Sequence, residues 1–313
     1  MKKLMMGIVA AMAMGVMAEI TNTVKVTKFH QSYPYSGKAT VNYTVGGTLP
    51  EGAVAEFTIN TDDASATFFQ GNVVTGVNTF TIDFASSFGG ALLLTNASFV
   101  VTIAELGGVQ LWENGPYWAE CNVDASKPEE YGYYFWWGDT VGYTHTGSGW
   151  ISVTDGTSIS FSSSGTAAST YGKDNSALQS AGYIDTTGNL VAAHDAATAH
   201  LGAPWRMPTD AEFSALIENC TTTWITTNGV PGKLVTGTGA YANRSIFLPA
   251  AGYGYNSNLY ISSASYGYYW SSTPNLGNSG GAWNLHLSSG NFSRNNSNRY
   301  TGQSVRPVRG FAQ

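Results

Sequence analysis

The chain has 313 residues, with 14 basic and 20 acidic side chains and a net charge of −6. This balance argues against a nucleic-acid partner, because phosphate binding needs a basic face. Charged residues make up only 11% of the chain, while Gly, Ser, Thr, Asn and Tyr are abundant. Such a composition is typical of a loop-rich extracellular protein rather than a cytosolic helical enzyme.

The first 18 residues have the form of a secretory signal peptide. Lys2 and Lys3 precede an apolar run over residues 4–16, and Val16-Met17-Ala18 fits the small-residue rule for signal peptidase. The run is about 13 residues long, whereas a membrane-spanning helix needs roughly 20. We therefore expect cleavage after Ala18, no transmembrane segment, and an exported protein that is extracellular or held at the cell surface.

Residues 19–107 alternate apolar and polar side chains with a period of two. Turn-forming residues such as Gly46-Gly47 and Pro50-Glu51-Gly52 separate the runs. Short strands at this spacing predict a small antiparallel, Ig-like β-sandwich domain. Its predicted inward-facing residues are Ala39, Val41, Tyr43, Val45, Ala53, Ala55, Phe57, Ile59, Phe80, Ile82 and Phe84. His30 stands alone, so we expect no chemistry in this domain.

Residues 108–313 differ in composition from the preceding domain. They contain aromatic clusters, glycine turns and two predicted helices. The first helix is predicted over residues 189–201. The second begins behind Pro208, where Thr209-Asp210-Ala211-Glu212 forms a capping box and Phe213, Leu216 and Ile217 follow at helical spacing. A domain with few helices and many short strands predicts the α+β class. Cys121 and Cys220 are the only cysteines, and the sequence leaves open a disulfide or two buried sulfurs.

Six strings in this second domain resemble the Fibrobacter major paralogous domain family. They are Trp118-Ala119-Glu120-Cys121-Asn122-Val123, Tyr131-Gly132-Tyr133-Tyr134-Phe135-Trp136-Trp137-Gly138, Trp205-Arg206-Met207-Pro208-Thr209, Phe247-Leu248-Pro249-Ala250-Ala251-Gly252, Tyr269-Trp270-Ser271-Ser272 and Ser304-Val305-Arg306-Pro307-Val308. The resemblance runs from about residue 109 to 310. It implies a C-type-lectin-like fold of the formylglycine-generating-enzyme type, as in the variable proteins of diversity-generating retroelements. Within that fold, Arg206 and Arg306 are expected to stabilise loops.

Neither catalysis nor a metal site is expected. The enzymes of that fold use two cysteines close together near the C-terminal end, and no Cys follows Cys220. The tripeptides of calcium-dependent lectins are also missing, although Trp283-Asn284 is a fragment of one. His194 and His200 lie six residues apart and so on different helix faces, and the adjacent Glu129 and Glu130 read as a solvent-facing turn. We predict a non-enzymatic protein that needs no cofactor.

The candidate binding region is the Asn-rich, Ser-rich and Tyr-rich segment 253–301. This composition resembles an antibody paratope, where Tyr and Trp supply rigid contact area and Ser, Gly and Asn supply adaptable hydrogen bonds. Trp283, Leu285 and Leu287 alternate with Asn284, His286 and Ser288, which predicts a strand with the polar set outward. The predicted ligand-binding residues are Tyr255, Asn256, Tyr260, Asn278, Ser279, Asn284, His286, Asn291, Ser293, Asn295, Asn296, Asn298 and Thr301.

These patterns predict an exported recognition protein. Its expected partner is a protein or a glycan on another cell, a phage or a host surface. The resemblance further implies that asparagine codons in this region are rewritten by a retroelement. Two alternatives stay open: a structural cell-surface or envelope protein without programmed variation, and asparagines that merely build turns.

Overall fold

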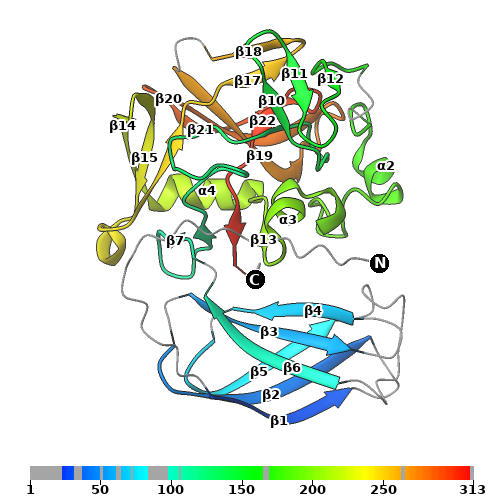
Figure 1. The fold of residues 1–313 in the computed structure, drawn as a ribbon, viewed down its shortest axis with the longest axis vertical. Coiled ribbons are helices and arrows are strands. Elements are labelled where there is room, and N and C mark those ends of the chain that lie inside the picture. The colour runs from blue at the N-terminus through cyan, green and yellow to red at the C-terminus, as the bar shows by residue number, and fades with distance from the viewer. Residues whose placement is uncertain are drawn as a thin grey trace. The chain divides into compact units, whose positions relative to one another are not determined.

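The computed structural model describes residues 23–31, 37–49, 52–60, 65–71, 73–83, 98–105, 107–164, 169–261 and 265–310. The chain divides into two compact units, residues 1–106 and residues 107–313 (Figure 1). The predicted signal peptide, residues 1–18, lies outside the described part. No helix that the structure describes is long and apolar enough to cross a membrane.

Unit 1 is built from two three-stranded antiparallel sheets, in the orders β1-β2-β5 and β4-β3-β6. The strands are β1 Thr23–Gln31, β2 Lys38–Gly46, β3 Ala53–Asn60, β4 Ser65–Gln70, β5 Gly76–Asp83 and β6 Ser98–Glu105. Val41 and Tyr43 from one sheet are buried in the same core as Phe57 and Ile59 from the other, which confirms the predicted inner faces. Phe84 lies outside the described residues.

Unit 2 centres on an eight-stranded sheet in the order β12-β11-β10-β9-β22-β19-β20-β21. Its strands are β9 Tyr134–Phe135, β10 Tyr143–His145, β11 Trp150–Ser152, β12 Ser158–Ile159, β19 Tyr266–Pro274, β20 Gly281–Ser288, β21 Phe292–Asn298 and β22 Gln303–Ser304. All neighbours are antiparallel except β19 and β22, which are parallel. This sheet, which we call the main sheet, carries most of the predicted binding region.

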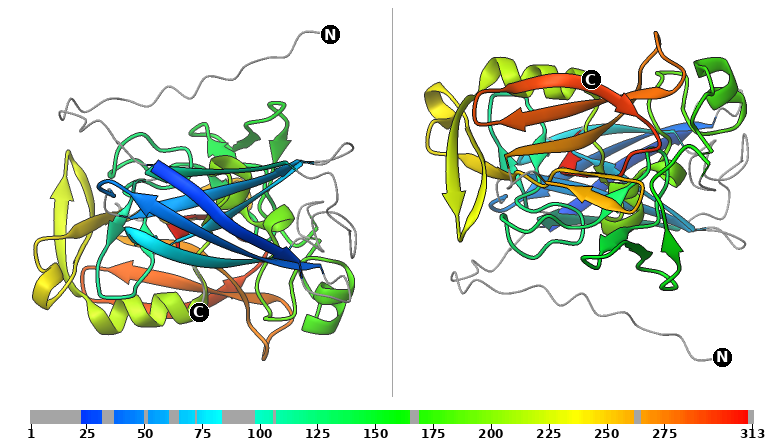
Figure 2. Two further views of the ribbon diagram at one scale, coloured as in Figure 1. Left: turned by 90° about the horizontal axis from the view of Figure 1, so that it is seen from below. Right: turned by 90° about the horizontal axis from the view of Figure 1, so that it is seen from above.

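Three smaller sheets surround the main sheet, in the orders β13-β23-β8-β7, β14-β15-β16 and β17-β18. Their strands are β7 Val109–Gln110, β8 Tyr117–Trp118, β13 Trp205–Arg206, β14 Thr221–Thr227, β15 Val230–Thr236, β16 Ser245–Pro249, β17 Tyr253–Tyr255, β18 Asn258–Tyr260 and β23 Val308–Arg309. The β17–β18 hairpin lies beside the strands of the main sheet (Figure 2). Backbone bridges from Gly252 to Gly267 and from Gly254 to Gly302 hold it there.

The helices of unit 2 are short and cover both faces of the main sheet. They are α2 Asn175–Ser180, α3 Ala196–Leu201, α4 Asp210–Asn219 and the 3₁₀ turns η2 Ala192–His194 and η3 Gly239–Tyr241. On one face, Phe213 and Leu216 of α4 pack with Leu285. On the other, Leu178 of α2 and Ala197 of α3 pack with Trp270.

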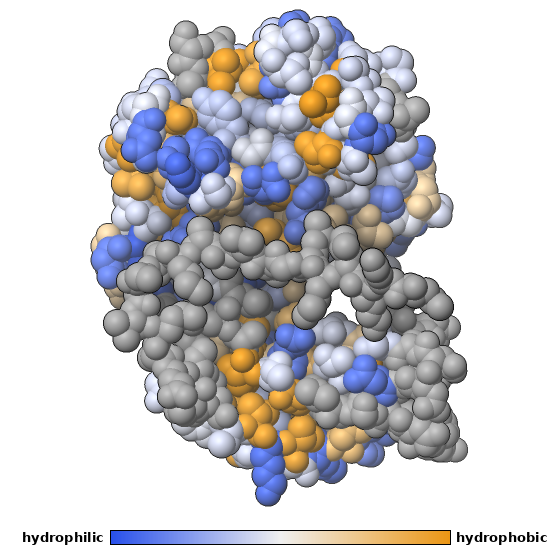
Figure 3. Space-filling model, in the orientation of Figure 1, coloured by the Kyte–Doolittle hydropathy of each residue, from blue (hydrophilic) through white to orange (hydrophobic). Residues whose placement is uncertain are grey.

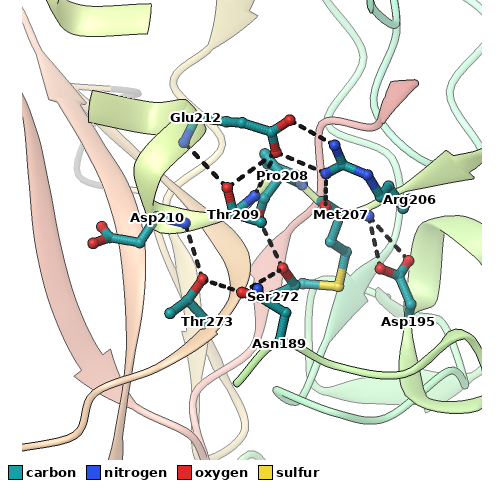
Figure 4. A network of polar contacts seen from close by, with 10 residues as sticks. All are labelled: Asn189, Asp195, Arg206, Met207, Pro208, Thr209, Asp210, Glu212, Ser272 and Thr273. Carbon is teal, nitrogen blue, oxygen red and sulfur yellow. Dashed lines mark hydrogen bonds and ion pairs between the residues drawn. The ribbon is translucent and has the colours of Figure 1, made fainter. Parts of the chain in front are cut away.

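The predicted start of α4 is confirmed (Figure 4). The Thr209 hydroxyl accepts a hydrogen bond from the Glu212 backbone N–H at 3.2 Å, and the Glu212 carboxylate accepts one from the Thr209 N–H at 2.8 Å. The same carboxylate holds Arg206 through two contacts of 2.6 and 2.7 Å. One glutamate therefore caps the helix and fixes the preceding strand.

The helix predicted over residues 189–201 is wrong for its first half. Leu190 forms an isolated β-bridge with Ile184, and η2 ends before Asp195. Asp195 has extended backbone and serves as the N-cap of α3, where its carboxylate accepts hydrogen bonds from the N–H groups of Thr198 and Met207. Capping by Asp195 confines the helix to the residues that follow it.

The predicted α+β class is also wrong, because the protein is mostly β. Within the residues that the structure describes, 47% lie in strands, which form several sheets, and 11% lie in helices. The capping box correctly marked one helix, but that helix has only ten residues. The surrounding Thr, Val, Tyr and Trp residues favour the pleated backbone of strands, and they build the sheets.

Candidate functional site

The predicted binding residues fall on the β17–β18 hairpin, on β20 and β21, and in the turns beside these strands. The structure exposes Tyr255, Asn256, Tyr260, Asn278, Ser279, Asn291, Asn296 and Asn298. It half-buries His286, Ser293 and Asn295, and it buries Asn284 and Thr301.

Strand register assigns the residues of the main sheet to two faces. Tyr268 on β19 lies opposite His286 on β20, and His286 lies opposite Ser293 on β21. These three side chains share one face, which we call the outer face. Tyr269 and Leu285 project from the other face into the core against α4. Side chains available to a partner on this sheet therefore come from the outer face.

Two of the predicted binding residues are buried, so the expectation that they are exposed to a partner is wrong. Asn284 lies on the outer face between Trp270 and Asn295, at the end where Trp270 packs beneath α2 and α3. Its side chain has no exposed surface, and its amide donates to the Ser297 hydroxyl at 2.6 Å. Thr301 is 8% exposed, and its hydroxyl donates to the Asn298 carbonyl in the turn after β21. Strand periodicity identified the correct face for Asn284, but not the elements that cover this end.

Some asparagines of the segment do build turns, as the alternative interpretation proposed. The carboxamide oxygens of Asn275 and Asn278 accept hydrogen bonds from the N–H groups of Gly277 and Gly280. The Asn295 oxygen accepts one from the N–H of Asn296. These amides are committed to local backbone, so a binding surface needs other groups as its main contacts.

Those other groups are aromatic. A row of rings crosses the outer side of the β17–β18 hairpin and continues onto the outer face of the main sheet. We call these rings the tyrosine strip: Tyr171, Tyr300, Tyr255, Tyr260, Tyr253, Tyr266, Tyr268 and His286. Only Tyr255, Tyr260 and His286 were predicted from the sequence.

Successive rings of the strip are in contact. Their centroids are 4.9 Å apart from Tyr171 to Tyr300, 6.0 Å from Tyr300 to Tyr255 and 6.3 Å from Tyr255 to Tyr260. The strip continues through Tyr253 and Tyr268 to His286, with separations of 5.2, 5.3 and 4.7 Å. All these distances lie in the range of favourable aromatic pairs. Each ring therefore limits the motion of the next one.

The hairpin places its tyrosines on one side because its other side is buried. Tyr253 lies opposite Tyr260, and Tyr255 lies opposite Asn258. Gly254, between the two tyrosines of β17, faces the interior, where a Cβ would lie 2.5 Å from the Phe161 ring. Glycine thus lets the hairpin settle against the aromatic core while its tyrosines point outward.

The rings combine exposure with partial burial. Tyr171, Tyr255 and Tyr260 are 39, 37 and 38% exposed. Burial, reinforced by neighbouring phenols, raises the pKa of Tyr253 and of Tyr268. Burial also lowers the pKa of His286. The phenols of Tyr253 and Tyr268 and the imidazole of His286 are therefore neutral at physiological pH.

His286 brings polar groups to one end of the strip, and Tyr300, next to Tyr171, brings them near the other end. The Asn291 amide nitrogen lies 2.9 Å from His286 Nδ1. Since an NH₂ group only donates, this assignment makes Nδ1 the acceptor and leaves the ring proton on Nε2. At the other end, the Asn298 amide donates to the Tyr300 hydroxyl at 2.8 Å. Amide groups thus flank the rings and supply hydrogen-bonding capacity.

The two cysteines are not bonded to each other, so the disulfide alternative is wrong and both are free and half-buried. Burial raises the pKa of Cys220 to about 11. Within the described ranges, no group of three or more His, Cys, Asp or Glu side chains is arranged to hold a metal ion. His194 and His200 instead contact separate carbonyls, those of Gly138 and Thr140.

The matched family is the Lcl C-terminal domain, whose sequence model covers residues 115–309. The chain therefore belongs to this family, and the match spans nearly all of unit 2. That finding is consistent with the resemblance to a Fibrobacter-type domain over the same region. Membership fits a surface-associated or ligand-binding protein. No curated protein and no solved structure matches the chain.

Proposed function

We propose that this chain is an exported recognition protein that contacts a protein or glycan partner through the tyrosine strip. The observation that carries the proposal is the continuous row of partly exposed rings on a rigid sheet and hairpin. Tyrosine gives a large contact area with few rotatable bonds, so little conformational entropy is lost when a partner binds. The signal-peptide pattern of residues 1–18 and the family membership support placing the protein outside the cytoplasm.

The same observation favours recognition over a purely structural role in the cell envelope. A protein that only packs with its neighbours needs no row of exposed tyrosines at one place on its surface. In Figure 3, pale residues of intermediate hydropathy cover much of the upper part of unit 2. Tyrosine, serine, threonine and glycine have this intermediate character, which suits a surface that meets both water and a partner.

The test compares three forms of the purified chain on an array of glycans and surface proteins and on intact cells. The wild type is expected to bind at least one target. The variant Tyr255→Ala with Tyr260→Ala is expected to lose at least about tenfold in affinity, because truncated aromatic anchors cost more than about 1.4 kcal/mol. The control is Tyr241→Ala on η3, whose ring lies outside the strip beside Arg244. Equal binding by all three forms would contradict the proposal.

Programmed variation by a retroelement is a separate part of the proposal. Exposed positions such as Asn256, Asn296 and Asn298 tolerate exchange, because surface substitutions cost little stability. The buried Asn284 does not fit the expected set. Sequencing the locus is the test, with a reverse-transcriptase gene and a near-identical template repeat nearby as the expected result. Their absence would remove programmed variation and leave the binding proposal unchanged.

A further inference from the structure

The segment that supplies most of the tyrosine strip has no charged residue. From Ser245 to Ser293 the sequence contains no Lys, Arg, Asp or Glu. This stretch includes β17, β18, β19 and β20 and all rings of the strip except Tyr171 and Tyr300. A charged partner would find no complementary charge along these strands.

The first two charged residues after this segment, Arg294 and Arg299, form contacts within the protein. Arg294 on β21 forms an ion pair with Asp210 at 3.3 Å, and its guanidinium lies 5.1 Å from the centre of the Trp283 ring. Arg299 is fully buried and donates to the carbonyls of Gly281, Thr170 and Lys173. Neither guanidinium forms part of the strip, so the rings between Tyr253 and His286 have no charged residue among them.

We infer that the tyrosine strip binds a neutral polysaccharide chain, an inference that rests on the proposed function and names its ligand class. A pyranose ring has a face of C–H groups whose hydrogens carry partial positive charge, and this face stacks on the negative π-face of tyrosine. Its hydroxyl groups point sideways and need donors and acceptors. A neutral row of partly exposed aromatic rings bordered by amides provides both kinds of contact, although stacked pairs such as Tyr253 and Tyr260 turn one face of each ring toward the other.

The geometry favours a chain of sugars over a single one. The rings follow one another with centroid separations of 4.7–6.3 Å from Tyr171 to His286. These separations are comparable to the length of one sugar unit, so a linear chain would meet several rings in succession. Weak individual contacts then add along the chain, as they do for other multivalent ligands.

Polar groups beside the rings match sugar hydroxyls better than a protein surface. His286 Nε2 carries a proton when Nδ1 accepts from Asn291. Asn256 and Asn258 on the exposed hairpin and Asn298 beside Tyr300 add side-chain amides. By contrast, the cores of protein interfaces combine aromatic residues with Met and Arg. From Ser245 to Ser293 the sequence contains no Met or Arg.

Affinity electrophoresis in native gels tests the inference with the full chain. The probes are four neutral polysaccharides, hydroxyethylcellulose, galactomannan, xylan and dextran, together with two charged counterparts, carboxymethylcellulose and dextran sulfate. We expect at least one neutral probe to retard the wild type, and we expect 0.5 M NaCl to leave this retardation unchanged. Binding that comes from stacking and neutral hydrogen bonds has little dependence on salt.

Three variants locate the binding. Tyr255→Ala with Tyr260→Ala is expected to lower the association constant for the neutral probe at least about tenfold. Tyr255→Phe with Tyr260→Phe keeps the stacking faces and is expected to stay within about threefold of the wild type. The control Tyr241→Ala is expected to bind as the wild type does. Circular dichroism melts identify any variant that fails to fold, and the single variant Tyr255→Ala, which is expected to weaken binding by a smaller factor, then replaces the alanine pair.

Two results would overturn the inference. One is retardation by the charged probes alone that disappears with salt, since this would mean an anionic ligand. The other is that no neutral probe retards the wild type, while the wild type binds a protein on the array and the variant Tyr255→Ala with Tyr260→Ala does not. The second result agrees with the proposed function, but it would mean that the partner is a protein and not a polysaccharide. Loss of the proposed function itself would instead appear as array binding that is equal in all variants.

Discussion

Buried arginines show how single residues hold the loops of unit 2. The Arg306 guanidinium has no exposed surface and donates to the carbonyls of Ala119, Glu120 and Phe247. Its Nε also donates to the Asn122 side chain at 2.8 Å. The planar fork of arginine places donors on three separate nitrogens and so reaches acceptors that lie apart, whereas the donors of lysine all sit on one nitrogen. The structure thus confirms the expected structural role of Arg306.

At Asn284, the burial found in the structure changes the expected outcome of mutation. We predict that Asn284→Ala lowers the free energy of unfolding by about 1–3 kcal/mol, because it leaves a cavity and removes the hydrogen bond to Ser297. Asn298→Ala on the neighbouring strand is the matched control and is expected to stay within about 0.5 kcal/mol. Urea unfolding of both variants measures the difference. Equal stability of the two variants would contradict the prediction.

The burial of His286 leads us to predict that the stability of the fold depends on pH. Burial lowers its pKa in the folded protein, while the unfolded chain keeps a value of about 6.5. Between these two pKa values the unfolded state binds more protons, so stability falls as the pH decreases below about 6.5 and is fully present above it. Urea unfolding at pH 7.5, 6.5 and 5.5 measures this loss. His286→Gln removes the titrating group, so its curve is expected to fall less over the same interval; parallel curves would contradict the prediction.

At the scale of elements, α4 depends on its first turn. Thr209→Ala removes the hydroxyl that accepts from the Glu212 N–H, and we predict a loss of about 1–2 kcal/mol in the free energy of unfolding. Thr209→Ser keeps the hydroxyl and is expected to lose less than half as much. Thermal unfolding followed by circular dichroism provides the comparison. If the serine and alanine variants melt together, the cap does not stabilise the helix.

The elements predicted correctly are those stabilised by contacts between residues that are close in the sequence. The capping box needs only Thr209 and Glu212, and the inner faces of β2 and β3 follow from period two alone. The split at Asp195 was missed because Asp195 caps α3 while it also binds Met207, twelve residues away. Helical spacing carries no signal for such a contact, so the helix over 189–201 was predicted too long.

The tyrosine strip shows the same limit for the candidate site. Tyr255 and Tyr260 belong to one hairpin, and their region was predicted from composition. Tyr171 joins the strip through Tyr300, 129 positions later in the chain. No periodicity links two such positions, since the three-dimensional fold alone brings them together. The charge-free run from Ser245 to Ser293 was readable in the sequence and is the signal that could have extended the site to Tyr253, Tyr266 and Tyr268.

At the scale of the whole molecule, the two units have separate cores. The clusters of unit 2 draw their residues from positions 109 to 308, and the cluster of unit 1 draws its residues from positions 24 to 103. Each unit therefore contains the apolar contacts that its own fold requires. Domains of about 200 residues with a core of their own commonly fold alone.

The fragment 107–313 is predicted to fold on its own, and more stably than the fragment 115–313 that starts where the family match begins. The shorter fragment lacks β7, which pairs with β8, and it lacks Leu111, which has no exposed surface. Losing a fully buried leucine alone removes about 1.5–3 kcal/mol, so we expect a difference of at least about 2 kcal/mol in the free energy of unfolding. Urea unfolding followed by tryptophan fluorescence measures both fragments. Equal midpoints would mean that residues 107–114 add nothing to the core, and the eight residues before the family match would then be a linker instead of part of the domain.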